Sequence, residues 1–473
     1  MIKFGTDGWR AVIADQFTFE NVSIVTQALI DYLNDLPAPN RTVAVGYDRR
    51  FLSEQFAAQV AAQMAANNFQ VLLFDAPVPT PMVSYQVKVA ALAAGVVITA
   101  SHNPPEFNGF KVKAAFGGSA PPEITQAIEA RLYRSKPQIG TLIDAIAAGH
   151  IEPIQPSADY GRQVARLVDL DRIKSANVNL VVDPMHGSGN RWVEHLLAGG
   201  NCRVRTIRAE RDAYFGGVNP EPLAQNLAPL AQAVHTDNAL IGLATDGDAD
   251  RVGALDEMGQ FINSHQIVAV LLLHLARRRG WQGGVVRTFS QSVLIKRIAE
   301  SLGLPLYETP IGFKYIAELM LTKDILIGGE ESGGIGILGH IPERDGIVNS
   351  LLLAEAVIAS ESRPSQLLSS IWREFGRFYY NRLDLHANIA RGKEFVERVR
   401  QSPPAQLGGE KVVDLATLDG TKLIFADESW LLLRQSGTEP VLRLYCEATS
   451  AEKMQTILAA AQDFAIAAGI QIC

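Results

Sequence analysis

The chain has 473 residues, of which 47% are hydrophobic and 20% charged, a composition typical of folded globular proteins. This length exceeds what one hydrophobic core supports, so it predicts roughly three or four domains. With 43 basic and 50 acidic residues the net charge is −7, which argues against a positive field that would hold nucleic acid or an anionic membrane.

The cysteines and the longest apolar runs bear on where the protein works. Cys202, Cys446 and Cys473 are far apart and match neither a disulfide framework nor the spacing of a zinc site, which favours a reducing cytoplasm. The apolar runs at 89–100 and 267–276 are shorter than the ~18 residues that span a membrane. The N-terminal MIKFGTDGWR has no apolar core of an export signal, so we expect a cytoplasmic protein.

The first half of the chain repeats an order of apolar strand, polar loop and amphipathic helix, which predicts βαβ units. TVAVGYDRR (42–50) indicates a strand that enters a charged loop, and Ser53 is expected to cap a helix with Phe56, Val60 and Met64 at helical spacing. Similar strand-to-loop patterns follow at 95–104, 178–190, 239–251 and 283–292. Polar loops at the carboxyl ends of strands are where α/β sheets bind ligands.

The period of this pattern is irregular, which favours duplicated α/β domains over a short-repeat solenoid. Near the C-terminus, WLLLRQSG and VLRLYCEAT indicate a hairpin, and an apolar helix over 451–468 follows it, so a separate α+β domain is expected there. The predicted domains are 1–153, 154–256, 257–370 and 371–473.

The first loop with chemical potential is TASHNPPEFNGFK, which places Ser101 just past a buried strand, with His102, Asn103 and Lys111 nearby. A serine in this place can carry a phosphoryl group, although Ser, Asn and Pro equally favour a plain turn. Because a hydroxyl is a weak nucleophile, it needs a base or a metal ion beside it.

TDGDADR provides candidate metal ligands. Asp246, Asp248 and Asp250 alternate along a segment that we expect to be extended, with room for an ion at Gly247 and Ala249. Clustered carboxylates bind hard cations such as Mg²⁺ and repel one another without one. The sequence therefore predicts a magnesium site.

Two other metal-dependent sites compete with this interpretation. An EF-hand loop would end at Glu257, but its sixth position requires glycine where Arg251 stands, and the preceding ALIGLAT is strand-like. A phosphatase with an aspartate nucleophile would use Asp246 and Asp248, but it leaves Ser101 and the third aspartate without a role.

Two further loops are candidates for substrate binding. GGEESGG offers carboxylate and hydroxyl oxygens that can pair with sugar hydroxyls, although an acidic surface turn has the same composition, and TPIGFKYI puts Lys314 on another loop. RQSGTEP offers a guanidinium fork and hydroxyls for a phosphate, although a Ser-Gly hairpin turn also explains it. No GxxxxGK[ST] motif occurs, so a nucleotide is not expected as the phosphoryl donor.

The chain resembles the α-D-phosphohexomutase superfamily in five motifs, which occur in the order and at the approximate spacing typical of that superfamily and span the whole chain. The motifs are FGTDGWR, TASHNPPEFNGFK, DGDADR, GGEESGG and RQSGTEP. The resemblance implies four domains around a central cleft, three related α/β domains with mixed sheets and a smaller α+β C-terminal domain. The catalytic residues that it implies are Ser101 as phosphoserine and Lys111 as general acid/base, with His102, Arg10 and Arg251 beside them. The Mg²⁺ ligands that it implies are Ser101, Asp246, Asp248 and Asp250. The substrate-binding residues that it implies are Glu330, Ser332, Lys314, Arg434, Ser436, Gly437 and Thr438.

The activity that the resemblance implies is interconversion of glucose 1-phosphate and glucose 6-phosphate through glucose 1,6-bisphosphate, which also serves as activator. GGEESGG is closer to the GEES form of glucose-directed members than to the dual-specific GEMSGH form, whose histidine is replaced by Gly334. Phosphomannomutase, glucose-1,6-bisphosphate synthase and, outside the class, a metal-dependent phosphatase or a non-catalytic sugar-phosphate sensor stay open. The expected partners are hexose phosphates, and monomer or homodimer is left open.

Overall fold

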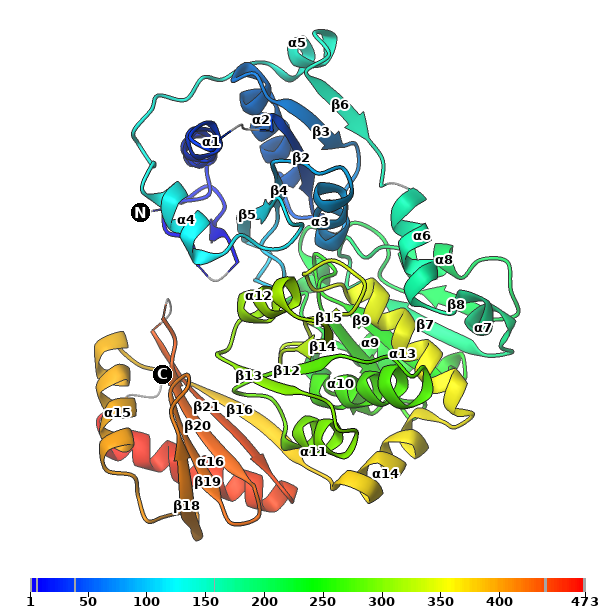
Figure 1. The fold of residues 1–473 in the computed structure, drawn as a ribbon, viewed down its shortest axis with the longest axis vertical. Helices are drawn as coiled ribbons and strands as arrows, with labels where there is room; N and C mark the ends of the chain where they lie inside the picture. The colour runs from blue at the N-terminus through cyan, green and yellow to red at the C-terminus, as the bar shows by residue number, and fades with distance from the viewer. Residues whose placement is uncertain (1, 6, 38–39, 157, 438–439, 471–473) are drawn as a thin grey trace.

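The computed structural model describes residues 2–5, 7–37, 40–156, 158–437 and 440–470. The described chain forms four β-sheets with helices packed against them (Figure 1). Within the described residues no helix has both the length and the apolar character that crossing a membrane requires.

The first sheet is mixed and has the strand order β1-β5-β4-β2-β3-β6. Its strands are β1 (Trp9–Val12), β2 (Thr42–Tyr47), β3 (Gln70–Phe74), β4 (Ala94–Ile98), β5 (Phe107–Ala114) and β6 (Ile151–Ile154). Its helices are α1 (Phe19–Asn34), α2 (Ser53–Ala66), α3 (Thr80–Val89), α4 (Pro122–Glu129) and α5 (Leu142–Ala147). The expected cap of α2 is wrong: Leu52, with φ of 60°, is the N-cap, and the Ser53 hydroxyl donates instead to Asp48 Oδ1 at 2.7 Å.

The second sheet, also mixed, has the order β11-β10-β9-β7-β8. Its strands are β7 (Asn179–Asp183), β8 (Arg203–Thr206), β9 (Ile241–Thr245), β10 (Val252–Leu255) and β11 (Phe261–Ile262). Helices α6 (Ala158–Leu167), α7 (Leu170–Ser175), α8 (Trp192–Leu196) and α9 (Ala228–Thr236) accompany it. β11 continues this sheet past residue 256, where a domain boundary was expected.

The third sheet has the order β13-β12-β14-β15. Its strands are β12 (Gly284–Thr288), β13 (Leu306–Thr309), β14 (Ile325–Gly329) and β15 (Ile335–Ile337). Helices α10 (Ser264–Leu273), α11 (Val293–Ser301), α12 (Phe313–Thr322), α13 (Gly346–Ser360) and α14 (Pro364–Phe375) belong to this part of the chain. α13 also packs against β9 and β10 of the second sheet, so the two sheets share a helix layer.

One connection recurs in the first three sheets. A strand with a parallel neighbour is followed along the chain by a strand that pairs with it antiparallel: β4 with β5, β9 with β10, and β14 with β15. The hairpin loops between these strands contain residues 99–106, 246–251 and 330–334. This repetition indicates three related units. It also places each of the three loops at the carboxyl end of a strand, where α/β proteins bind ligands.

The fourth sheet is antiparallel throughout, with the order β16-β21-β20-β19-β18-β17, and lies beside the third sheet (orange to red in Figure 1). Its strands are β16 (Tyr379–His386), β17 (Gln406–Leu407), β18 (Glu410–Ala416), β19 (Thr421–Phe425), β20 (Trp430–Gln435) and β21 (Val441–Ala448). Its helices are α15 (Ile389–Gln401) and α16 (Ala451–Ala467). The predicted fold class, three α/β domains with mixed sheets and an α+β C-terminal domain, is confirmed.

One hydrophobic core includes side chains from all four sheets, among them Val97, Leu243, Val285 and Leu432. A second core fills the face of the first sheet that α1 and α2 cover, and a third lies between the fourth sheet and its two helices. Because close-packed interiors deform little, the shared core keeps the loops of different sheets in fixed positions relative to one another.

Candidate active site

Ser101 lies in the hairpin loop after β4 and is only 1% exposed. Its backbone is left-handed, with φ of 54°, which is uncommon for a residue other than glycine. Its N–H donates to Thr99 Oγ1 at 2.9 Å, and its hydroxyl donates to Asp246 Oδ2 at 2.7 Å. The serine of the first domain therefore points at the aspartate cluster of the second.

The two loops approach so closely because residue 247 is glycine. A Cβ atom on Gly247 would lie 2.4 Å from the carbonyl oxygen of Ser101 and 3.1 Å from Pro220. Any side chain there would push the serine loop away. This glycine thus serves the contact between the loops, which differs from the expected role of making room for an ion.

The aspartate segment turns, and the expectation of an extended segment is wrong. Ala249 has φ of 59° and donates its N–H to the carbonyl of Asp246 at 3.0 Å. Asp246 Oδ1 accepts the N–H groups of Asp250 and Arg251, each at 3.0 Å. The carboxylates converge because side-chain hydrogen bonds to the backbone close the turn.

The three carboxylates fit a divalent cation. Asp246, Asp248 and Asp250 are fully buried, and each offers one oxygen within 4.8 Å of the others. Among the described residues nothing donates a hydrogen bond to Asp248 Oδ1 or Asp250 Oδ1. Burial and repulsion from its two neighbours raise the pKa of Asp246 well above its ordinary value. Buried acceptors without donors, in an all-oxygen set, are consistent with Mg²⁺.

Lys111 projects from β5 into the same cluster. Its Nζ lies 2.8 Å from Asp248 Oδ2, 3.2 Å from Asp250 Oδ2 and 2.8 Å from Asp7 Oδ2. Burial alone would lower the pKa of this lysine, but the three carboxylates outweigh burial and raise the pKa well above its ordinary value. Lys111 is therefore an ammonium ion that offsets negative charge beside Ser101, and its role as general acid/base stays a prediction.

The other predicted catalytic side chains lie around the serine. His102 Nδ1 is 3.4 Å from Ser101 Oγ, and burial, together with the cations around it, holds the pKa of this histidine well below its usual range. Arg10 Nη1 donates to Asn103 Oδ1 at 2.6 Å. Arg251 pairs with Glu221 at 2.9 Å. The geometry brings these residues to the serine loop, and their roles in turnover stay predictions.

The sugar-binding candidate Glu330 directly follows β14, and its loop is linked to the aspartate hairpin by the hydrogen bond from Val252 N to Gly333 O at 3.1 Å. Burial raises the pKa of Glu330 to about 7 against the opposing charge of Arg344. Its neighbour differs: Glu331 accepts the hydroxyl of Ser290 at 2.7 Å. The two glutamates therefore have different surroundings: Glu330 faces Arg344 and the charge of Asp250, whereas Glu331 contacts Ser290.

Two substrate-binding candidates lie elsewhere than expected. Lys314 is in the first turn of helix α12, where a loop was expected, and its Nζ lies 4.9 Å from the ring centroid of Tyr315. Arg434 lies within strand β20 and donates to Asp419 Oδ2 at 2.9 Å. That carboxylate oxygen also accepts the N–H of Ile311 at 2.9 Å, so Asp419 connects the fourth sheet to the third.

The remaining candidates have mixed outcomes. Ser332, in the loop after β14, is partly buried. Ser436 is buried and donates its N–H to Val441 O at 2.9 Å, and Gly437 beside it is exposed. Thr438 lies outside the described residues. The phosphate-binding role of this turn stays a prediction.

Sequence reasoning missed Arg344, which lies just before α13. Its Nη2 is 2.6 Å from Asp7 Oδ2 and 2.9 Å from Asp250 Oδ2, and its Nη1 is 3.8 Å from Glu330 Oε2. Asp7 lies inside FGTDGWR, so the sequence held a signal for it. The residues next to Arg344 in the sequence do not distinguish it from a surface arginine. Its ion-pair partners in this cluster all come from remote parts of the chain.

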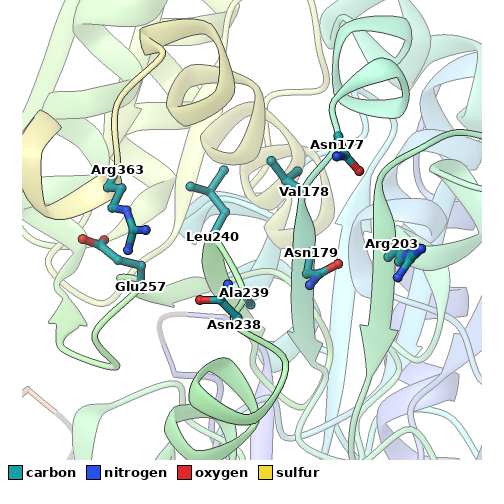
Figure 2. Close-up of a pocket in the computed structure, with 9 residues that line it drawn as sticks. All are labelled: Asn177, Val178, Asn179, Arg203, Asn238, Ala239, Leu240, Glu257 and Arg363. Atoms are coloured by element: carbon teal, nitrogen blue, oxygen red, sulfur yellow. The ribbon is translucent and has the colours of Figure 1, made fainter.

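The recess in Figure 2, with a volume of about 430 Å³, lies away from this cluster. It is lined by Asn177, Val178, Asn179, Arg203, Asn238, Ala239, Leu240, Glu257 and Arg363. These residues include the first residues of β7 and β8, whereas the aspartate turn follows the last residue of β9. The recess is therefore at the opposite end of the second sheet and is not part of the site.

Comparison with known protein families identifies the family of this chain. Four models of phosphoglucomutase/phosphomannomutase, for α/β/α domains I, II and III and for the C-terminal domain, match residues 1–138, 158–259, 263–375 and 395–463. The chain belongs to this family. It is a phosphohexomutase of the α-D-phosphohexomutase superfamily, whose typical substrates are hexose phosphates.

Relatives span the whole chain. A phosphoglucomutase/phosphomannomutase of Thermococcus kodakarensis is 31% identical over 456 residues, 96% of each chain. A protein of Methanobrevibacter smithii, provisionally named phosphoglucosamine mutase, is 30% identical over 460 residues, again 96% of each. The crystal structure of a protein from Thermus thermophilus, provisionally assigned as a phosphomannomutase, is 34% identical, with a TM-score of 0.87 over 98% of this chain and 99% of that one.

Proposed function

We propose that this phosphohexomutase interconverts glucose 1-phosphate and glucose 6-phosphate through a phosphorylated Ser101 and glucose 1,6-bisphosphate. The observation that carries the proposal is the hydrogen bond of 2.7 Å from the buried Ser101 hydroxyl to Asp246, within a triad of carboxylates. An ordinary turn serine has no reason to be buried against three carboxylates, whereas a phosphoryl carrier beside a metal site does.

The transfer needs no nucleotide and no water. The Oγ–P bond of phosphoserine breaks, a bond forms from phosphorus to the free hydroxyl oxygen of the hexose monophosphate, and the hydroxyl proton ends on Ser101 Oγ. After the bisphosphate turns over, the reverse transfer from its other end restores the phosphoserine. Lys111, as an ammonium ion, offsets the charge that develops during both transfers.

Asp246, Asp248 and Asp250 would hold Mg²⁺ together with an oxygen on Ser101. A bound Mg²⁺ supplies charge neutralisation for the phosphoryl group. The chain itself supplies the orientation: Asp246 Oδ2 accepts the hydrogen bond that aims Oγ into the cluster. Arg10 and Arg251 are proposed as further cations around the phosphoryl group.

Recognition of the hexose is assigned to Glu330 and Ser332, whose oxygens can pair with ring hydroxyls. A Cβ atom on Gly334 would lie 2.3 Å from Arg344 Cδ, so Arg344 fills the space that a side chain at position 334 would need. The histidine of the dual-specific form is replaced by this glycine, and its absence supports glucose phosphates over mannose phosphates.

The phosphate that does not react is assigned to Arg434, Ser436, Gly437 and Thr438, with Lys314 near the sugar. One cradle must accept either end of the substrate, because the bisphosphate turns over between the two transfers. Arg434 is suited to this task because its guanidinium can form two parallel hydrogen bonds to a phosphate.

The test is product analysis by ³¹P and ¹³C NMR with glucose, mannose and glucosamine 1-phosphates, each with and without added hexose bisphosphate. We expect the fastest conversion with glucose 1-phosphate. Preferred conversion of glucosamine phosphate, the activity in the name of the Methanobrevibacter relative, would refute the glucose assignment. Net accumulation of the bisphosphate would instead identify a bisphosphate synthase.

The phosphoserine is tested separately by mass spectrometry of the active enzyme and by Ser101→Ala. We expect phosphate on Ser101 and nearly complete loss of turnover in the variant. Ser84→Ala is the control, because Ser84 is also buried and its hydroxyl has no hydrogen-bond partner among the described residues. A phosphate found on Asp246 would contradict the mutase mechanism.

A further inference from the structure

The side chain of Arg50, in the loop after β2, is fully buried beneath the serine loop. Its Nη2 donates to the carbonyl oxygens of Ser101 at 2.7 Å and Asn103 at 2.6 Å. Its Nη1 donates to the carbonyl oxygens of Pro104 at 2.7 Å and Phe107 at 3.1 Å. One guanidinium thus binds three backbone carbonyls of the loop that carries Ser101 and a fourth at Phe107, the first residue of β5.

Asp48 connects the same guanidinium to the other side of Ser101. Asp48 Oδ2 lies 3.2 Å from Arg50 Nε and accepts the hydroxyl of Thr99 at 2.6 Å. The Thr99 oxygen in turn accepts the N–H of Ser101 at 2.9 Å. Both peptide groups that flank the serine are therefore held by the pair of Asp48 and Arg50.

The second domain completes the enclosure of Arg50. The ring of Phe215 lies 4.9 Å from Arg50 Cζ, a distance at which a guanidinium is attracted to an aromatic face. Arg211 Nη2 donates to the backbone carbonyl of Arg50 at 3.3 Å. Both residues belong to the domain that carries the aspartate turn, so Arg50 is anchored to both partners of the catalytic contact.

The serine loop requires such an anchor. Ser101 has φ of 54°, a conformation unfavourable for a side chain with a Cβ atom, which persists only when its surroundings enforce it. A planar guanidinium with five donors can bind several carbonyls at once, whereas an ammonium group has three donors in a different geometry. An arginine is therefore specifically suited to this position.

We infer that Arg50 is a positioning residue for phosphoryl transfer: it holds the loop 101–107 in the one backbone conformation that aims Ser101 Oγ at Asp246. The inference rests on the proposed role of Ser101 as phosphoryl carrier. Arg50 has no contact with the aspartate oxygens of the triad among its described hydrogen bonds and ion pairs, so it acts through the loop backbone.

The decisive variant is Arg50→Lys, which keeps the positive charge and loses the planar guanidinium with its parallel N–H donors. We expect kcat to fall about 10- to 100-fold while KM changes less than about threefold, because misplacement of a reacting group slows transfer more than it weakens substrate binding. In ³¹P NMR of the phosphorylated enzyme, one phosphoserine resonance in the unaltered protein should become several or broaden. The affinity for Mn²⁺, followed by electron paramagnetic resonance, should fall by no more than about threefold, because the three aspartates, which supply all the anionic ligands, are intact and only the Ser101 oxygen is displaced.

The matched control is Arg41→Lys. Arg41 is in the same domain, stacks on Phe69 at 5.2 Å and donates to one backbone carbonyl, that of Asn67 at 3.4 Å, away from the serine loop. Its replacement should leave kcat and the ³¹P resonance unchanged. Ser101→Ala is run alongside: if it keeps mutase activity, the proposed function fails, whereas an inactive Ser101→Ala with a fully active Arg50→Lys overturns only the role of Arg50.

A fall in kcat that comes with a raised KM, weaker metal binding and a lower melting temperature in Arg50→Lys would show general damage and overturn the positioning role. If Arg50→Lys does not fold, Phe215→Leu decides. It removes the ring and keeps the hydrogen bonds, and a kcat decrease of about two- to fivefold with a broadened phosphoserine resonance is expected. An unchanged kcat with a single sharp resonance would overturn the inference.

Discussion

The hydroxyl of Ser101 donates a hydrogen bond of 2.7 Å to Asp246 Oδ2, although 145 residues separate the two in the chain. The contact joins the first hairpin loop to the second across a domain boundary. It is possible because Gly247 lets the two backbones touch and because both loops are the turns of equivalent hairpins. The proposed chemistry depends on this contact, and so do the predictions for the metal and the substrate.

Asp248→Asn should weaken Mg²⁺ binding by at least about tenfold and lower turnover strongly, because one anionic ligand is lost from a cluster that needs the charge of the ion. Isothermal titration with Mg²⁺ and steady-state kinetics measure the two effects. Asp237→Asn is the control, since Asp237 pairs with Arg205 on the surface of the same domain. Unchanged Mg²⁺ affinity in Asp248→Asn would show that the triad is not the metal site.

Arg434→Ala should impair the conversion of glucose 1-phosphate and of glucose 6-phosphate alike. Loss of a charge-assisted fork to phosphate in a partly shielded site should cost about 2 to 4 kcal/mol, or roughly 30- to 1,000-fold in kcat/KM. Arg400→Ala, on the exposed face of α15, is the control. Impairment in one direction only, beyond what the equilibrium constant requires, would argue against one cradle for both orientations.

Glu330→Gln should remove the rise of kcat/KM with pH that the unaltered enzyme is expected to show around pH 7. Burial raises the pKa of Glu330 to about 7, so this carboxyl gains its charge as the pH rises through that value. A charged carboxylate accepts hydrogen bonds from sugar hydroxyls more strongly, so kcat/KM of the unaltered enzyme should rise by up to about tenfold over this range. The substrate phosphate titrates in both proteins, and comparison with Glu330→Gln cancels it. Identical profiles would refute the role of Glu330.

Lys422, at the contact between the third and fourth sheets, should make the stability of the protein depend on pH. Its Nζ lies 4.1 Å from the ring centroid of Phe289 and 4.5 Å from that of Trp430, and burial lowers its pKa to about 7. The unfolded lysine, with a pKa of about 10.4, binds its proton more tightly, so the destabilisation is nearly complete at about pH 7 and disappears as the pH rises towards about 10.

Lys422→Met should therefore raise the free energy of unfolding at about pH 7 by about 2 to 4 kcal/mol, and the difference should shrink towards about pH 10. Thermal unfolding of both proteins across this pH range measures the change. Lys393→Met is the control, because Lys393 is exposed on α15. A stability difference that does not change with pH would show that Lys422 is charged in both states.

The candidate site illustrates how far sequence patterns reach. The positions of Ser101 and the three aspartates in loops at strand ends were predictable, because both loops follow apolar strands. The aspartate segment was predicted to be extended, which is wrong. An alternating pattern of aspartates does not reveal that Asp246 Oδ1 accepts two backbone N–H groups and so bends the chain. Lys314 was placed on a loop for a similar reason, since the helix start at Phe313 has no capping side chain.

The sequence by itself determined the class of fold and the family, because strand patterns and motif residues are local properties of the chain. Tertiary structure alone decided which groups surround Ser101. Arg344 meets Asp7, Asp250 and Glu330, and Arg50 reaches the carbonyls of the serine loop and the ring of Phe215, only because packing of the sheets brings these segments together. Hydrogen bonds and ion pairs form between groups a few ångströms apart in space. The separation of two residues along the chain therefore does not predict whether they form one.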